Sequence, residues 1–325
     1  MKLDLQLYRG YANDTELVVY GHIFESWGPG NYKIDRNGLY HTFSIWKMFS
    51  INPLKNVKVT IEFKSVTASS VTNANGFFKF RLPYSFELPP GWHPYTITCQ
   101  PKNHRYGIIE TSELRKPYKT GISVISDIDD TFLVSHSSTI WKKLYVLLTR
   151  NVHQRKTFVD VVAHYKALER NQVHDGSPNS FFFVSSSEWN LYYFIIQFSI
   201  LQKLPKAVLK LKDIKTGILD FLKTGGGNHD HKFHKIESII SFYPNNRYIL
   251  LGDDSQKDAD IYERISATYP KNIKAVYLRQ VSKHQKSAIQ AKLDHIENNN
   301  IPTCYFKSSA TAIAHSIKIG IIQDS

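Results

Sequence analysis

Apolar runs alternate with helical stretches from about residue 121 to the end of the sequence, and no other feature restricts the possible fold as strongly. The apolar runs lie at residues 122–125, 181–184, 207–211, 248–251, 275–278 and 303–306, and the helical stretches at 157–171, 232–242, 259–268 and 283–298. Strands that are apolar on both faces and are followed by helices predict a parallel, Rossmann-like α/β sheet with helices on both faces. Such sheets bind ligands outside the carboxyl ends of their strands.

The first 120 residues have a different pattern. Short runs rich in β-branched and aromatic residues, at 17–20, 57–63, 77–82 and 95–99, are separated by turn residues, and no helix-length periodic segment interrupts them. This pattern predicts a small antiparallel β-sandwich. We therefore expect two domains, a β-sandwich-like accessory domain at residues 1–120 and an α/β domain at residues 121–325.

Composition narrows the class of protein. The 325 residues include 19 Phe, 19 Tyr and 5 Trp, which excludes a disordered chain. The spacing of the two cysteines, Cys99 and Cys304, excludes a disulfide framework and a cysteine zinc site. No run reaches the roughly 18 apolar residues of a spanning helix, and residues 1–21 lack a signal-peptide core, so we expect a cytoplasmic protein. The formal net charge of +13 suits nucleic acid, phospholipid surfaces or phosphorylated metabolites.

Three carboxylates follow the first strand of the α/β region. Asp127, Asp129 and Asp130 stand directly after it, and Thr131 follows them. Carboxylates this close repel one another, so a metal ion, a lysine or both must offset their charge. Asp127 and Asp129 are two residues apart, so one of them can attack a substrate while the other transfers protons. A solvated acidic turn is the plainer alternative.

Polar residues also follow later strands. Ser185 and Ser186 come after the second strand, where a hydroxyl binds a phosphoryl oxygen or simply caps the next helix. Lys232 stands at the start of a predicted helix, where the helix dipole disfavours a cation. Either an anionic partner stabilises the lysine there, or its side chain is simply exposed to solvent. Asp253 and Asp258 follow a glycine that permits a tight turn after the fourth strand. Mg2+ needs one or two such carboxylates besides water and phosphate oxygens.

In this chain order, the motifs resemble those of the haloacid dehalogenase superfamily of phosphohydrolases. The resemblance rests on Asp127-x-Asp129-x-Thr131, Ser185, Lys232 and Gly252-Asp253-(x4)-Asp258. Longer stretches, at 126–131, 184–192, 231–237 and 251–262, resemble phosphatidate phosphatases of the actin-patch-protein type, which are distant relatives of lipins. Bacterial-type members also carry a short β-domain in front.

The resemblance covers the chain from about residue 121 to its end and implies a haloacid dehalogenase-like fold. One departure is Asp254-Ser255, where the family usually has Ser-Gly. We expect Asp254 either to add a metal ligand or to face water.

The resemblance also implies a mechanism. Asp127 would attack phosphorus and form an aspartyl-phosphate, and Asp129 would act as general acid and base. Lys232 would offset the charge of Asp127. The implied substrate-binding residues are Thr131, Ser185 and Ser186. The implied Mg2+ ligands are Asp127, Asp129, Asp253 and Asp258.

Two runs without acidic residues stand near the predicted site. The first, from residue 131 to 159, contains Lys142, Lys143, Arg150, Arg155 and Lys156. The second, from residue 189 to 212, combines four lysines with a group of aromatic residues. We expect both runs to meet an anionic substrate or a membrane surface, although a helix packed on the sheet explains the first run equally well.

The sequence therefore predicts a Mg2+-dependent phosphatidate phosphatase, a phosphoric monoester hydrolase that contacts the membrane peripherally. Two alternatives are open. The same fold can hydrolyse a soluble phosphomonoester, such as a nucleotide, a phosphosugar or a nucleic-acid end. A non-catalytic membrane or interaction module is the other alternative, although it gives no reason to keep mutually repelling carboxylates. Nucleic acid fits less well because no recognised binding motif is present.

Overall fold

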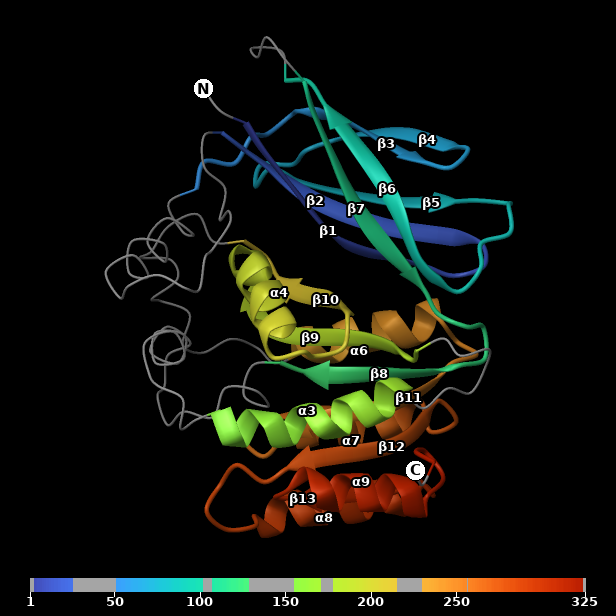
Figure 1. Cartoon of the computed structure of the whole chain (residues 1–325), viewed down its shortest axis with the longest axis vertical. Helices are drawn as coiled ribbons and strands as arrows, with labels where there is room; N and C mark the ends of the chain where they lie inside the picture. Colours follow the sequence, from blue (N-terminus) through green and yellow to red (C-terminus); the bar gives the residue numbers. More distant parts are fainter. Residues whose placement is uncertain are drawn as a thin grey trace. The chain divides into compact units, whose positions relative to one another are not determined.

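The computed structural model describes residues 3–25, 51–101, 107–128, 155–170, 178–214, 230–255 and 257–323 (Figure 1). The chain divides into two compact units. The first unit consists of Met1–Pro117, Glu188–Gln197 and Leu211–Gly226, and the second of Tyr118–Ser187, Phe198–Lys210 and Gly227–Ser325. The chain therefore passes between the units several times.

The first unit contains a seven-stranded sheet. Its strands are β1 (Leu3–Ala12), β2 (Glu16–Glu25), β3 (Lys58–Phe63), β4 (Val66–Val71), β5 (Phe77–Pro83), β6 (Gly91–Cys99) and β7 (Ile108–Lys116), in the order β4-β3-β6-β7-β1-β2-β5. The predicted antiparallel pairing is confirmed for β1 with β2, β2 with β5, β3 with β4, β3 with β6 and β6 with β7. It is wrong for β1 and β7, which run parallel. These two strands are far apart in sequence, so no hairpin turn fixes their direction.

Alternating side chains build the core of this sheet. In β3, Val59, Ile61 and Phe63 are buried while Lys58 and Glu62 are exposed. The buried residues join a cluster with apolar side chains of the other strands. The buried side chains of these strands thus form one apolar core.

The second unit contains a six-stranded sheet with the order β10-β9-β8-β11-β12-β13. Its strands are β8 (Ile122–Asp127), β9 (Ser180–Glu188), β10 (Ala207–Lys212), β11 (Arg247–Asp253), β12 (Ile273–Arg279) and β13 (Thr303–Phe306). β8 pairs in parallel with β9 and β11, β11 with β12, and β12 with β13. The predicted parallel sheet is confirmed. The strand order reverses at β8, which makes the β8–β11 boundary the expected ligand position.

The helices are α3 (Arg155–Arg170), α4 (Tyr192–Leu201), α6 (Asp230–Phe242), α7 (Asp258–Thr268), α8 (Ser287–Glu297) and α9 (Ser309–Lys318), with a short 3-10 helix, η2 (Trp189–Leu191). The hydroxyl of Tyr277 in β12 forms a hydrogen bond with the hydroxyl of Ser316 in α9. Ser316 also forms a hydrogen bond with His164 of α3. Tyr248 of β11 instead donates to the carbonyl of Ile239 in α6. Tyr277 lies opposite Leu251, three residues beyond Tyr248, so the two tyrosines point to opposite faces. Helices thus cover both faces, as predicted. Within the described ranges, no helix has the length and apolar character needed to cross a bilayer.

Candidate active site

Asp127 ends β8 and is 1 % exposed. The strand lies at the reversal point of the sheet, between β9 and β11. The ammonium of Lys232 lies 2.9 Å from Asp127 Oδ1. A buried carboxylate is costly unless an opposite charge accompanies it, and Lys232 supplies that charge.

Lys232 is the third residue of α6 and is also buried. Its Nζ donates to Asp258 Oδ1 at 2.6 Å besides contacting Asp127. The two possibilities that the sequence left for Lys232 are thereby decided in favour of an anionic partner. Two carboxylates offset the unfavourable position of a cation at a helix start.

Asp258 is the first residue of α7, and its Oδ2 accepts a hydrogen bond from the backbone N–H of Asp253 at 3.3 Å. A carboxylate at a helix N-terminus is favourable. A side chain at Gly252 would place Cβ 2.6 Å from Asp258 Oδ2 and 2.8 Å from Tyr262 Cε2. The sequence suggested a tight turn at Gly252, but the residue lies inside β11, and the close approach of Asp258 is what requires glycine there.

Asp253 ends β11 and is fully buried. Its Oδ1 accepts a hydrogen bond from the backbone N–H of Ser255 at 2.6 Å. Because Leu251 pairs with Ser126, Asp253 lies just beyond the end of β8, beside Asp127. The predicted acidic residues of these two strands therefore meet at one edge of the sheet.

Ser185 is placed on the neighbouring strand. Val184 of β9 pairs with Asp127, and Ser185 follows directly. Its Oγ accepts a hydrogen bond from the N–H of Ser187 at 2.8 Å, and its carbonyl accepts one from Lys235 Nζ at 2.7 Å. Ser185 is buried, whereas Ser186 is exposed. Of the two predicted serines, only Ser185 is enclosed among the strand ends.

Asp129 and Thr131 lie outside the described residues, as does the part of the first basic run from residue 131 to 154. Their predicted roles stay predictions. The structure brings together the described members of the predicted set: Asp127, Lys232 and Asp258 in direct contact, Asp253 through its bond to Asp258, and Ser185 on the adjacent strand.

Asp254 has neither of the two roles expected for it. Its Oδ1 accepts hydrogen bonds from the backbone N–H groups of Val281 and Ser282 at 2.9 and 3.1 Å, and its Oδ2 accepts from the hydroxyls of Ser282 and Tyr305. Burial opposes its charged form, but these donors outweigh burial and hold the pKa of Asp254 below its usual value. Asp254 therefore fixes the loop after β12.

Arg279 is a candidate site residue that the sequence analysis missed. It ends β12, is 6 % exposed and lies opposite Asp253 in the strand register. Burial raises the pKa of Tyr165, a hydrogen bond to Ser126 and the charge of Arg279 oppose that rise, and Asp127 adds to it. Arg279 therefore stands at the strand end next to that of Asp253. The strand-end rule applied to the other strands would have found Arg279, because it directly follows the apolar run 275–278.

The second acid-free run combines buried aromatic residues with exposed lysines, and its contact with an anionic substrate or surface stays a prediction. Its aromatic residues are largely buried, including Trp189, Tyr192 and Phe198. Lys203 and Lys206, which follow α4, are exposed. The aromatic side chains are therefore part of a core.

The donor chemistry of the site fits a hard divalent cation. Asp127, Asp253 and Asp258 contribute three carboxylates and Lys232 one ammonium, a formal balance of −2 before Arg279 is considered. Among the described residues, no group of three or more acidic, histidine or cysteine side chains is placed to hold a metal. Mg2+ requires fewer protein ligands than three, since one or two carboxylates suffice when water and phosphate oxygens complete its coordination. Asp127 and Asp253 suit this role better than Asp258, whose oxygens already accept from Lys232 and Asp253.

Comparison with known proteins identifies the segment that contains these residues. Residues 122–280 match the family model described as phosphatidate phosphatase APP1, catalytic domain. Phosphatidate phosphatase APP1 of Saccharomyces cerevisiae is 25% identical over 215 residues, which are 66% of this chain and 35% of that protein. The match thus spans about a third of the length of this relative.

Solved structures show weaker likenesses. A carbohydrate acetylesterase from Xanthomonas citri aligns with a TM-score of 0.31 and 10% identity over 94% of this chain and 68% of its own. A β-glucuronidase from Parabacteroides merdae aligns with a TM-score of 0.29 and 7% identity over 94% of this chain and 47% of its own. TM-scores of this size do not establish a shared fold.

Proposed function

We propose that this chain, whose residues 122–280 match the family model of the phosphatidate phosphatase APP1 catalytic domain, is a Mg2+-dependent phosphatidate phosphatase. The observation that carries the proposal is the buried ammonium of Lys232 between Asp127 and Asp258, inside the segment that matches the family. A nucleophilic carboxylate requires an oriented and charge-balanced setting, and this contact supports such a setting.

In the proposed reaction, a carboxylate oxygen of Asp127 forms a bond to the phosphorus of phosphatidate while the bond to the diacylglycerol oxygen breaks. Asp129 protonates the departing alkoxide and then takes a proton from the water that hydrolyses the aspartyl-phosphate. Phosphate leaves, and the carboxylate of Asp127 is restored. Lys232 orients Asp127 through Oδ1 and offsets the negative charge that gathers around phosphorus.

Further residues bind the phosphoryl group in this proposal. The hydroxyl of Ser185 donates a hydrogen bond to a phosphoryl oxygen, and Arg279 adds a positive charge at the end of β12. The chemistry that Mg2+ supplies, when Asp127 and Asp253 hold it, is Lewis-acid polarisation of the phosphoryl oxygens. Contact with an anionic membrane surface would bring the lipid substrate to the protein.

Phosphate release from phosphatidate in mixed micelles tests the proposal. We expect release with Mg2+, loss of release with EDTA and its return with added Mg2+. Asp127→Asn should lower the rate by at least about 1000-fold, because the nucleophile is removed. Asp260→Asn is the matched control, since Asp260 is an exposed acid of the same site-forming helix, α7, and pairs with Lys292.

Undiminished release by Asp127→Asn would show that the site is assigned wrongly. Release from nucleotides or phosphosugars without any release from phosphatidate would refute the lipid substrate and favour a phosphatase of soluble phosphomonoesters.

A further inference from the structure

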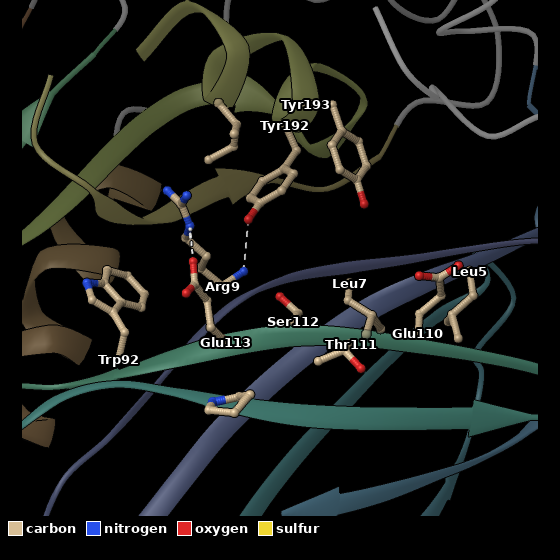
Figure 2. A pocket seen from close by; sticks show the side chains of 12 residues that line it. Leu5, Leu7, Arg9, Trp92, Glu110, Thr111, Ser112, Glu113, Tyr192 and Tyr193 are labelled. Carbon is tan, nitrogen blue, oxygen red and sulfur yellow. Dashed lines mark hydrogen bonds and ion pairs between the residues drawn. The ribbon is translucent and has the colours of Figure 1, made fainter. Parts of the chain in front are cut away.

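The first unit contains a cavity of about 440 Å³, and all the residues that line it belong to that unit. Figure 2 shows Arg9 in its wall, where Nε donates to Glu113 Oε1 at 3.1 Å and the backbone N–H donates to the hydroxyl of Tyr192 at 2.9 Å. The charge of Arg9 is thus offset within the wall, so the cavity points to no particular ligand. In the second unit, by contrast, hydrogen bonds lead directly to the candidate nucleophile.

Two hydrogen bonds of the second unit connect α3 to Asp127. The hydroxyl oxygens of Tyr165 and Ser126 lie 2.6 Å apart, and the hydroxyl of Ser126 donates to the carbonyl oxygen of Asp127 at 2.7 Å. All three residues belong to this one unit and are buried. We call the connection from Tyr165 through Ser126 to the Asp127 carbonyl the hydroxyl relay.

The protons of the hydroxyl relay point in one direction. A serine hydroxyl has a single proton, and that of Ser126 goes to a carbonyl oxygen, which can only accept. The oxygen of Ser126 therefore accepts from Tyr165, whose phenol has to be protonated in order to donate. Burial raises the pKa of Tyr165, so the phenol keeps its proton throughout the physiological pH range.

The hydroxyl relay holds the backbone of Asp127, whereas Lys232 holds its side chain. Asp127 is the last residue of β8, and Lys232 Nζ lies 2.9 Å from its Oδ1. The carbonyl and the carboxylate belong to the same residue, so a rotation of the backbone at this strand end would turn the carboxylate away from Lys232. The candidate nucleophile is therefore fixed at two points.

Tyr165 is itself fixed against the sheet. Its ring stacks on that of Phe181 in β9, with centroids 6.0 Å apart and planes 29° apart, within the usual range for aromatic pairs. Phe181 pairs with Val124 of β8, which is two residues before Ser126. The hydroxyl of Tyr165 thus has a defined position relative to the strand that carries Asp127.

A second relay of the same chemistry lies in the same unit. The hydroxyl oxygens of Tyr277 and Ser316 are 2.6 Å apart, and Ser316 donates to the carbonyl oxygen of Ala312 at 2.8 Å. Tyr277 and Ser316 are fully buried, and Ala312 lies on α9, where no site residue was predicted. Loss of the Tyr277 hydroxyl therefore removes the same kind of bond as loss of the Tyr165 hydroxyl, without touching Asp127.

We propose that Tyr165 is a positioning residue that acts through Ser126 and keeps the carboxylate of Asp127 aimed at the phosphoryl group. The proposal rests on the proposed function for the role of Asp127 as nucleophile. Tyr165 and Ser126 act through the backbone of Asp127 and need no contact with the substrate. A displacement of about 1 Å lowers a rate by up to about 100-fold, so a partly released backbone is enough to slow the reaction.

Kinetics of the full-length protein with phosphatidate in mixed micelles and Mg2+ test the proposal. We expect Tyr165→Phe to lower kcat by about tenfold and to change KM by less than about twofold, because the aim of the nucleophile matters in the chemical step and not in binding. Tyr277→Phe is the matched control. It should lower the Tm by a similar amount and leave kcat unchanged.

A double variant separates the hydroxyl relay from a general loss of packing. Ser126→Ala removes the donor to the Asp127 carbonyl and should lower kcat by at least about tenfold. Adding Tyr165→Phe to Ser126→Ala should lower kcat no further, because both substitutions interrupt one relay. Ser126→Ala alone serves as the test should Tyr165→Phe fail to fold.

Hydrogen–deuterium exchange gives a readout that needs no substrate. Tyr165→Phe should speed exchange at the backbone amides of Asp127 and Ile128 by about fivefold, because the strand end loses its support from α3. The same amides should exchange at the unaltered rate in Tyr277→Phe.

Equal kcat and equal exchange in Tyr165→Phe and Tyr277→Phe would overturn the inference, as would a double variant whose two losses in kcat multiply. Faster exchange at Asp127 and Ile128 in a protein that never hydrolyses phosphatidate would support the hold on Asp127 and refute the proposed function, so the two failures are distinguishable.

Discussion

Lys232 illustrates at the scale of one residue what the fold adds to a motif. A lysine in the first turn of a helix is unfavourable by itself, and it is stable here because carboxylates from β8 and α7 surround its ammonium. Neither Asp127 nor Asp258 is near Lys232 in the sequence. The motif therefore indicated only that Lys232 could have an anionic partner. The packing of α6 against β8 and α7 brings that partner into contact with it.

Asp254 yields a prediction at the same scale. Asp254→Asn should lower the free energy of unfolding by about 2 to 4 kcal/mol, because an amide cannot accept from all the donors that surround both carboxylate oxygens. Urea denaturation at pH 7 measures the loss. Asp294→Asn is the control, since Asp294 is exposed on α8 and its carboxylate accepts a hydrogen bond from the side chain of Gln290.

The pH dependence of Asp254 follows from its lowered pKa. The folded state holds the proton less tightly than the unfolded state, so the stabilisation is complete above the unfolded pKa and is lost as pH falls through the folded pKa. Asp254→Asn should therefore remove part of the acid sensitivity below about pH 4. An unchanged acid limb in the variant would contradict this account.

At the scale of elements, α6 connects two strand ends. Lys232 and Lys235 are three residues apart on one face of the helix, and they reach Asp127 of β8 and the Ser185 carbonyl of β9 respectively. The position of α6 thus couples the candidate nucleophile to the polar end of β9.

Lys235→Met tests this coupling. It removes the bond to the Ser185 carbonyl and should raise KM for phosphatidate by about 3- to 10-fold while kcat changes less. His234→Ala on the same helix is the control, because the His234 side chain is 67% exposed and should leave both constants unchanged. Equal effects of the two substitutions on KM would show that α6 does not hold this end of β9.

The elements themselves were largely predictable in the α/β region. The run 303–306 coincides with β13, and the other five apolar runs lie inside observed strands. The strands extend further because polar residues such as Ser185 continue β9 beyond its apolar part. The burial of Trp189 and Tyr192 was not predicted, because periodicity shows that a segment is apolar without showing which strands it packs on. The parallel pairing of β1 and β7 likewise depends on contacts distant in sequence.

At the scale of the whole molecule, each unit contains a buried histidine. Burial lowers the pKa of His22 in β2 to about 3, and burial with a contribution from His315 lowers the pKa of His164 in α3 to about 3. An unfolded histidine titrates near 6.5, so below that pH the unfolded state binds a proton that the folded state refuses. Stability is therefore complete above about pH 6.5 and falls as pH decreases toward 3.

We expect the free energy of unfolding to fall by about 2 to 3 kcal/mol per buried histidine between pH 7 and pH 4.5. Urea denaturation at the two pH values measures this. His22→Gln and His164→Gln should each reduce the difference, whereas His295→Gln, at an exposed position, should not. A pH difference that is the same in all variants would show that other groups carry the acid sensitivity.

The sequence by itself determined the parallel sheet and the strand ends at which polar residues gather, because periodicity, turn residues and motif spacing are local properties of the chain. The tertiary structure decided which charges meet. Lys232 contacts Asp127 and Asp258, Asp254 turns to the loop after β12, and Trp189 packs on Tyr8 of the N-terminal unit. These outcomes depend on residues up to 181 positions apart in the chain, which no local pattern encodes.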